Sequence, residues 1–322
     1  MKDNSSYRFL LIFLVATAIF FVSYFSANLA QEAFPTSASS QPFLLSSPLA
    51  NQASSTSLLK ENGTSLRSSV GLIPDFHLKA DLAAPDVQLQ AALIEDLKTR
   101  TRYFSLNIYR SWPTASLTKL MTMVITLQKF KLDDKIEITS SDIAPYDDFM
   151  RVGDIYSVED MMKLMLALSS NTAANAMANH YGFSDFINLM NNQASDWGMS
   201  QTHYDESIGL SPSNVTSAAD LEKLAYEIYN NYPFIFNLSR NAQQKVVDLN
   251  SGIEKTVSSI DYFAGEPDFL GGKTGSTDEA QGNLVSVFDY EGRPILVIVL
   301  GSGDRFKDTQ DLFNWFKNSY TF

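Results

Sequence analysis

The sequence predicts an α/β (α+β) fold, in which an antiparallel sheet is packed with helices and an all-helical subdomain is added. Two observations support this prediction. Segments 283–288 and 295–300 are rich in Val, Ile and Leu, and they follow a Gly- and Thr-rich segment at 269–277; short polar breaks separate the three, as expected for neighbouring antiparallel strands. Between Asp154 and Tyr232, the apolar residues instead recur at helical spacing. A helical cluster between early and late strands favours a sheet covered by helices, with a site at their junction.

The composition divides the chain into three regions. Residues 1–30 form a membrane anchor or signal segment, 31–80 a flexible tether rich in Ser, Ala and Pro, and 81–322 a folded domain. The folded part, of about 240 residues, is long enough to bury a sizeable core. A tether of this composition behaves as a flexible coil with a mean reach of about 40 Å. An unprocessed pro-segment is the alternative interpretation of 31–80.

The first region predicts attachment to a membrane. An almost wholly apolar run from Phe9 to Phe25 follows Lys2 and Arg8, and its length is at the short end of what spans a bilayer. The segment 26–30 matches the small-residue cleavage pattern of signal peptides poorly, which favours a retained anchor over a cleaved signal peptide. In either case the long region that follows is exported and acts in the cell envelope.

Composition also excludes several classes of function. The formal net charge of −12 and the absence of basic patches argue against nucleic acid as a partner. The chain has no cysteine, which excludes thiol catalysis and disulfides. Its three histidines, His77, His180 and His203, stand in no metal-binding or triad motif, and His180 is expected at a helix end. We therefore expect neither a metal ion nor a cofactor.

Ser116 and Lys119 form an S-x-x-K motif at the predicted start of a helix. After Pro113, apolar residues recur at helical spacing: Leu117, Leu120, Met121, Val124 and Leu127. Positions three apart share a helix face, so the Lys119 amine can reach the Ser116 hydroxyl. Burial and a second cation, Lys273, would lower the pKa of Lys119 and let it act as a base. The alternative is a helix N-cap serine followed by a solvated lysine.

Ser169, Ser170 and Asn171 form a second motif, in a polar break between two apolar helical stretches. The first of these helices begins with a capping box at Ser157 and Asp160. A hydroxyl at Ser169 could relay a proton, and the Asn171 amide could hold a peptide carbonyl. The alternative is an ordinary loop whose serine caps the second helix.

Lys273, Thr274 and Gly275 form a third motif inside the predicted strand 269–277. A strand edge here could pair with an extended peptide, while Lys273 and Thr274 meet its terminal carboxylate. The alternative is a glycine-rich strand end with an exposed lysine.

In this order, the three motifs resemble those of the serine D-Ala-D-Ala carboxypeptidases, the low-molecular-mass penicillin-binding proteins. The segments Trp112–Thr122, Leu166–Ala178 and Gly271–Val285 carry the resemblance, and Ala91–Lys98 is similar to the opening strand of the family. The resemblance extends from about Val87 to the last residue. The resemblance implies a β-lactamase/transpeptidase-like fold for this region.

The resemblance also implies a role for each motif residue. Ser116 would attack the carbonyl between two D-alanines, Lys119 would accept its proton, and Ser169 would pass a proton to the departing D-alanine. The backbone N–H groups of Ser116 and Ser276 would stabilise the oxyanion. The residues that would bind the substrate are Asn171, Lys273, Thr274, Gly275 and Ser276.

The implied partners are peptidoglycan stem peptides ending in D-Ala-D-Ala and β-lactam antibiotics. A D,D-carboxypeptidase is the favoured activity; a D,D-endopeptidase would use the same site, so the motifs leave both open. A class A β-lactamase would have Asp at the place of Ser170 and a water-activating glutamate, and neither Glu206 nor Glu222 stands in such a loop. A non-catalytic wall-binding or penicillin-sensing module is the remaining alternative.

Two departures from the family pattern bear on the site. Where many members have an arginine or an Asn-rich segment upstream of the third motif, this chain has Val257, Ser258 and Ser259, so carboxylate binding has less support there. The glycine that usually follows the third motif is displaced by one position, to Gly282.

Overall fold

The computed structural model describes residues 76–321. The predicted anchor at 1–30 and the tether up to residue 75 lie outside the described residues. Within 76–321, no helix is both long and apolar enough to cross a membrane. The packed region includes Phe76, upstream of the expected boundary at residue 81, because its ring stacks on Tyr290 and belongs to a hydrophobic core.

A five-stranded antiparallel sheet forms the centre of the domain, in the order β10-β11-β12-β2-β3. Its strands are β2 (Ala91–Asp96), β3 (Arg102–Leu106), β10 (Phe269–Thr277), β11 (Gln281–Tyr290) and β12 (Arg293–Ser302). The predicted late strands therefore pair as expected, and the predicted opening strand completes the sheet beside β12. Strand β10, which carries the third motif, lies at an edge.

Two hydrophobic cores cover the two faces of this sheet. Strand β12 is buried along its whole length, and its successive residues alternate between the cores. Leu296 and Ile298 contact the core shared with the helical subdomain, whereas Ile295 and Val297 contact the core under α8 (Arg305–Ser319). A strand buried on both faces has no polar alternation, which explains the continuous apolar run in the sequence.

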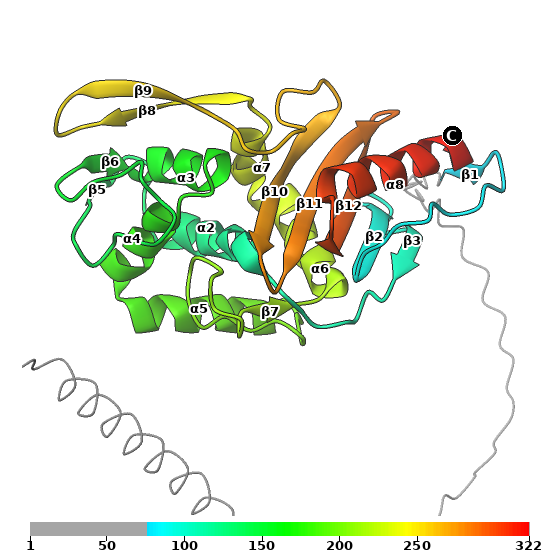
Figure 1. Cartoon of the computed structure of the whole chain (residues 1–322), viewed down its shortest axis with the longest axis horizontal. Coiled ribbons are helices and arrows are strands. Elements are labelled where there is room, and N and C mark those ends of the chain that lie inside the picture. Colours follow the sequence, from blue (N-terminus) through cyan, green and yellow to red (C-terminus); the bar gives the residue numbers. More distant parts are fainter. Residues whose placement is uncertain (1–75, 322) are drawn as a thin grey trace, which may run out of the picture. The chain divides into compact units, whose positions relative to one another are not determined.

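The remaining helices lie on the opposite face of the sheet from α8 or build the helical subdomain (Figure 1). They are the single 3₁₀ turn η1 (Ala115–Leu117) and the α-helices α2 (Thr118–Lys129), α3 (Val158–Ala167), α4 (Asn171–Tyr181), α5 (Phe183–Asp196), α6 (Ala218–Asn231) and α7 (Pro233–Ser239). The predicted cap is present, since the Ser157 side chain accepts a hydrogen bond from the backbone N–H of Asp160. His180 lies in the last turn of α4, as expected. The α/β fold with an all-helical subdomain is thus confirmed.

Four two-stranded ribbons complete the described region. They are β1 (His77–Leu78) with β13 (Tyr320–Thr321), β4 (Trp112–Pro113) with β7 (Val215–Thr216), β5 (Lys135–Glu137) with β6 (Ile155–Ser157), and β8 (Gln243–Asp248) with β9 (Ile253–Ser258). The pairing of β4 with β7 holds the chain just before η1, and so helps to position the first motif.

Candidate active site

The first motif lies where η1 continues into α2. Ser116 is in the 3₁₀ turn and Lys119 is the second residue of α2, so the serine precedes the α-helix rather than opening it. Ala115 adopts a left-handed backbone with φ of 47°, an uncommon conformation for a residue with a side chain. This turn presents Ser116 to the Lys119 amine, whose Nζ lies 2.9 Å from the serine Oγ.

Lys119 is fully buried and has three hydrogen-bond partners. Besides Ser116, its Nζ donates to Asn171 Oδ1 at 2.8 Å and to the carbonyl of Ile208 at 2.7 Å. Burial lowers the pKa of Lys119 to about 7, although the carboxylates of Glu206 and Asp147 act in the opposite direction. A substantial fraction of this lysine is therefore neutral near neutral pH.

Lys273 on β10 is also buried, close to the second motif. Its Nζ donates to Ser169 Oγ at 3.0 Å and to the Thr274 carbonyl at 2.7 Å. Burial lowers the pKa of Lys273 well below its usual range, and the positive charge of Lys119 lowers it further. For Lys119 itself, burial is the main cause of the lowered pKa, rather than the second cation that we expected to contribute.

The second motif forms the turn between α3 and α4. Ser169 has a left-handed backbone with φ of 56°, which directs its hydroxyl to Lys273. Ser170 caps α4, so the helix-cap interpretation of this break holds for that residue. Asn171 contacts Lys119 through its oxygen, and its Nδ2 donates to the Pro145 carbonyl at 2.9 Å. This turn therefore contacts both lysines, Lys273 through Ser169 and Lys119 through Asn171.

The third motif lies close to η1, the turn that carries Ser116. A Cβ atom at Gly275 would lie 3.1 Å from the backbone nitrogens of Ser116 and Leu117, so a side chain here would crowd the turn. Gly275 thus lets the edge strand β10 lie against η1. Thr274 and Ser276, on either side of it, face the cleft.

A cleft of about 780 Å³ joins the three motifs. Its floor is lined by Ser116, Ser169, Asn171, Thr274, Gly275 and Ser276. Tyr146, Leu210 and Ile260 form an apolar rim, on which Tyr146 is 93% exposed. Every residue that the motifs predicted either lines this cleft or, like Lys119 and Lys273, hydrogen-bonds to a residue that does.

Two carboxylates beside the site were not predicted. Glu206 accepts hydrogen bonds from the backbone N–H groups of Gly209 at 2.8 Å and Ser211 at 3.1 Å, and so shapes the loop whose Ile208 carbonyl contacts Lys119. From the sequence, Glu206 was considered only as a water-activating residue, and no loop of that kind was found around it. Asp147 accepts from the backbone N–H of Thr172 at 2.8 Å and stabilises the turn of the second motif. Neither residue belongs to a motif, so the sequence carried no signal for these contacts.

Arg305, at the start of α8, was also missed. Its side chain lines the cleft, and one guanidinium nitrogen donates to the Gly275 carbonyl at 3.2 Å. The sequence lacks an arginine at 257–259, upstream of the third motif. In the structure, the cation Arg305 reaches the same cleft from α8, which follows β11 and β12 in the chain.

Comparison with known proteins shows the family of this chain. The sequence profile of the Peptidase_S11 family, the D-alanyl-D-alanine carboxypeptidases, matches residues 79–304. The chain belongs to this family. It is therefore a serine hydrolase of the penicillin-binding protein class, and its place in a family of cell-wall enzymes implies that it acts outside the cytoplasm.

The relatives within the family include two kinds of peptidase. The D-alanyl-D-alanine endopeptidase of Escherichia coli is 30% identical over 242 residues, which cover 72% of this chain and 78% of the relative. The endopeptidase of Pseudomonas aeruginosa is 32% identical over 238 residues, covering 70% and 76%. The carboxypeptidase DacC of Escherichia coli is 27% identical over 270 residues, covering 74% and 64%.

Solved structures share the fold. Penicillin-binding protein D2 of Listeria monocytogenes, in its ampicillin-bound form, is 26% identical with a TM-score of 0.65, and the match covers 72% of this chain and 98% of that one. A D-alanyl-D-alanine carboxypeptidase from Mycobacterium tuberculosis has a TM-score of 0.68 at 22% identity, covering 76% and 96%. The transpeptidase-like fold that the resemblance implied is confirmed.

Proposed function

We propose that this protein removes the terminal D-alanine from peptidoglycan stem peptides ending in D-Ala-D-Ala, through an acyl-enzyme on Ser116. The observation that carries the proposal is the 2.9 Å contact between Lys119 Nζ and Ser116 Oγ, made by a buried lysine whose pKa is lowered to about 7. A neutral amine beside an alcohol is a suitable general base near neutral pH.

Acylation follows from this geometry. Neutral Lys119 accepts the hydroxyl proton while Ser116 Oγ forms a bond to the carbonyl carbon of the penultimate D-alanine. Backbone N–H groups of Ser116 and Ser276 stabilise the oxyanion, where loss of a single donor typically costs about 3 kcal/mol. When the C–N bond breaks, the leaving nitrogen takes a proton from the Ser169 hydroxyl, which Lys273 contacts at 3.0 Å. The proton that Lys119 accepted then returns to Ser169, so that Lys119 is neutral again.

Substrate binding explains the placement of the cations. The terminal carboxylate of the substrate binds between Thr274, Ser276 and the guanidinium of Arg305, all of which line the cleft. A bound anion favours the protonated form of nearby Lys273, and a charged Lys273 disfavours protonation of Lys119. The anionic end of the substrate therefore promotes the neutral, reactive form of the base.

Hydrolysis of the acyl-enzyme completes the reaction. Water gives a proton to neutral Lys119 as its oxygen attacks the ester carbonyl; the bond to Ser116 Oγ then breaks, Lys119 returns the proton to Oγ, and the shortened stem peptide leaves. A β-lactam would acylate the same serine, but its leaving nitrogen stays attached through the opened ring and hinders the attacking water. The ampicillin-bound form of the Listeria relative supports this part of the proposal.

The proposed location is the outer side of the cytoplasmic membrane. The apolar run at 9–25, with both early cations on its N-terminal side, would anchor the protein, and 31–80 would let the domain reach the peptidoglycan. If the first segment is cleaved, the same domain is released into the cell envelope.

The test uses the purified protein with a fluorescent penicillin and with a peptide ending in D-Ala-D-Ala. We expect stable labelling together with D-alanine release, and loss of both in Ser116→Ala. Lys119→Ala should nearly abolish labelling, while Lys273→Ala should weaken both activities. Rapid penicillin turnover without D-alanine release would instead indicate a β-lactamase, and neither activity would indicate a wall-binding module. Full labelling of Ser116→Ala would refute the nucleophile assignment.

A further inference from the structure

Tyr146 lies on the rim of the catalytic cleft and makes little contact with the rest of the domain. Its side chain lines the cleft, yet 93% of its surface is exposed. Its backbone has a φ of 60°, in the left-handed region that an aromatic residue rarely occupies and that glycine adopts without strain. The chain therefore holds a large ring at a position whose backbone disfavours it, and the proposed mechanism gives that ring no role.

The residues on either side of Tyr146 are fixed to the second motif and the start of α4. The Pro145 carbonyl accepts a hydrogen bond from Asn171 Nδ2 at 2.9 Å, and the Asp147 carboxylate accepts one from the Thr172 backbone N–H at 2.8 Å. These two contacts hold the backbone of Tyr146 in its left-handed conformation. The ring is therefore presented to the cleft by a well-supported turn.

The same backbone conformation occurs in both turns that carry the proposed reacting serines. Ala115, with a φ of 47°, precedes Ser116, and Ser169 itself has a φ of 56°. Strained conformations persist where the surrounding structure over-determines them, and they cluster at ligand-binding and catalytic sites. The conformation of Tyr146, on the rim of the same cleft, thus indicates that its ring contacts a ligand.

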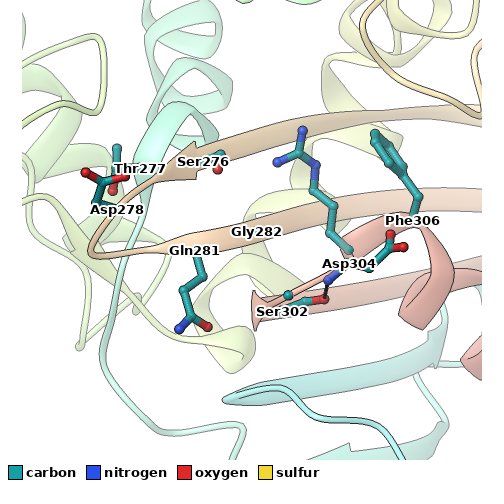
Figure 2. Close-up of a pocket in the computed structure, with 10 residues that line it drawn as sticks. Ser276, Thr277, Asp278, Gln281, Gly282, Ser302, Asp304 and Phe306 are labelled. Carbon is teal, nitrogen blue, oxygen red and sulfur yellow. Dashed lines mark hydrogen bonds between the residues drawn. The ribbon is translucent and has the colours of Figure 1, made fainter.

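The direction of a bound ligand decides which part of it the ring meets. In the proposed function, on which this inference rests, the leaving side binds at Thr274 and Arg305, and the scissile carbonyl lies at the backbone N–H of Ser276. The acyl side of an extended ligand then continues along β10 toward the β10–β11 turn, where Figure 2 shows Thr277 and Asp278. The leaving side therefore occupies the other end of the cleft.

Tyr146 belongs to that other end. Its turn is fixed to the segment 169–171, in which Ser169 hydrogen-bonds to Lys273, the residue before Thr274 on β10. The groups attached to the nitrogen that Ser169 protonates should thus lie beside the ring. In a peptide these groups are the methyl and carboxylate of one D-alanine, which are too small to cover an aromatic ring. In a penicillin they form a fused, methyl-bearing ring with an apolar face.

We propose that Tyr146 is a specificity-determining residue, whose ring packs on the fused ring of bicyclic β-lactams and makes them better acylating agents than β-lactams without that ring. The covalent step is the one already described. Ser116 Oγ bonds to the lactam carbonyl carbon, the lactam C–N bond breaks, and the nitrogen takes a proton from Ser169. The contribution of Tyr146 is apolar surface that both rings remove from water.

The experiment compares two β-lactams with the same phenylacetyl side chain: benzylpenicillin, and an N-sulfonated monocyclic β-lactam that has no fused ring. Second-order acylation rate constants are measured for the wild type, Tyr146→Gly and Tyr146→Phe. We expect Tyr146→Gly to lose about tenfold or more with benzylpenicillin, but less than about twofold with the monocyclic compound and in kcat/KM for D-alanine release. Tyr146→Phe should stay within about twofold of the wild type on every compound, because it keeps the ring.

Glycine separates binding from folding in this test. It suits a φ of 60°, so Tyr146→Gly should unfold at a temperature close to that of the wild type. Glu291→Gly is the matched control. Glu291 has a similar φ of 53°, but it lies in the turn between β11 and β12 and does not line the cleft. This variant should leave all three rates unchanged.

Three outcomes would overturn the inference. Equal losses of Tyr146→Gly on both β-lactams would assign the ring to the acyl side or to the shape of the cleft. Unchanged rates would show that the ring does not touch the ligand, and a Tyr146→Phe variant as slow as Tyr146→Gly would show that the ring face is not what binds. Failure of the proposed function gives a different result, in which the wild type is acylated by neither compound and releases no D-alanine.

Discussion

At the scale of single residues, the chemistry of this site depends on burial of two lysines within one polar cluster. An amine in water is protonated at neutral pH and cannot act as a base. Here desolvation lowers the pKa of Lys119 to about 7, and hydrogen bonds from its Nζ to Asn171 and Ile208 keep the group aligned with Ser116. Two carboxylates, Glu206 and Asp147, limit how far the pKa falls.

The pH dependence of acylation follows from the lowered pKa. In the proposed mechanism the neutral form of Lys119 is the base, so the rate of penicillin acylation should rise with pH, reach half its maximum near pH 7, and fall about tenfold per unit below that. Glu206→Gln removes the first of the charges that raise the pKa of Lys119, so its midpoint should lie at lower pH. Stopped-flow measurement of penicillin labelling from pH 5 to 9 gives the midpoint of the wild type and that of Glu206→Gln. A midpoint that is the same in both proteins would contradict this electrostatic coupling.

Arg305 should act on substrate binding rather than on the base. Charge-assisted hydrogen bonds contribute about 1.5–3 kcal/mol, so Arg305→Ala should raise KM for a D-Ala-D-Ala peptide by about tenfold or more. Arg305→Lys should recover part of this loss. A peptide with a C-terminal amide is the control, because without the carboxylate the substitution should have little effect. Equal losses on acid and amide would show a structural role instead.

At the scale of elements, the site depends on close contacts between backbones. Strand β10 lies against η1 because Gly275 has no side chain, and the loop after Glu206 lies against the same turn because of Gly209. A Cβ atom at Gly209 would lie 1.9 Å from the Ala115 carbonyl oxygen, which is far inside contact distance. The nucleophile turn is thus enclosed by elements from distant parts of the sequence.

Gly209→Ala should therefore displace the nucleophile turn. Gly153→Ala is the matched control, since Gly153 has a similar φ of +90° but no heavy atom within 4 Å of its Cβ position. Backbone strain alone should cost the control about 1–3 kcal/mol and leave penicillin labelling intact. Gly209→Ala should lose more stability and most of its labelling. Denaturant unfolding and labelling rates test this, and equal behaviour of the two variants would contradict it.

At the scale of the whole molecule, the described region has its own two cores and a catalytic cleft between its sheet and its helical subdomain. The chain carries a formal net charge of −12, yet Lys119, Lys273 and Arg305 are concentrated in or beside the cleft. Because burial lowers the pKa of both lysines, Arg305 is the one of these three side chains that stays charged, and it shares the cleft lining with Asp278 and Glu279.

A chain that begins at Ser69 should fold and react without the preceding residues, because the first core residue in the described region is Phe76. We expect its thermal midpoint and penicillin labelling to equal those of the full chain. The full chain should sediment with membranes, whereas the shortened chain should remain in the supernatant. Equal partitioning of the two would refute the N-terminal anchor, and a shortened chain that fails to fold would show that residues before 69 contribute to the core.

Much of this protein was determined by local sequence. Strands β11 and β12 were predicted because residues buried on both faces must be apolar, and the spacing of Ser116 and Lys119 placed them on one side of a helix start. The motif residues were also predicted from sequence, because their types and order match the proposed chemistry, and the fold places them around one cleft. These features depend on neighbours a few positions apart.

Tertiary structure alone decided the rest. Arg305 reaches the cleft, Glu206 and Asp147 oppose the lowered pKa of Lys119, and Gly209 fits against Ala115 only because the fold brings segments together that are far apart in the chain. Burial and the electric field at a buried amine are sums over all surrounding atoms, and no local pattern records them. The sequence therefore determined which groups we propose to react, and the packing of distant elements determined their charge, their strain and the space around them.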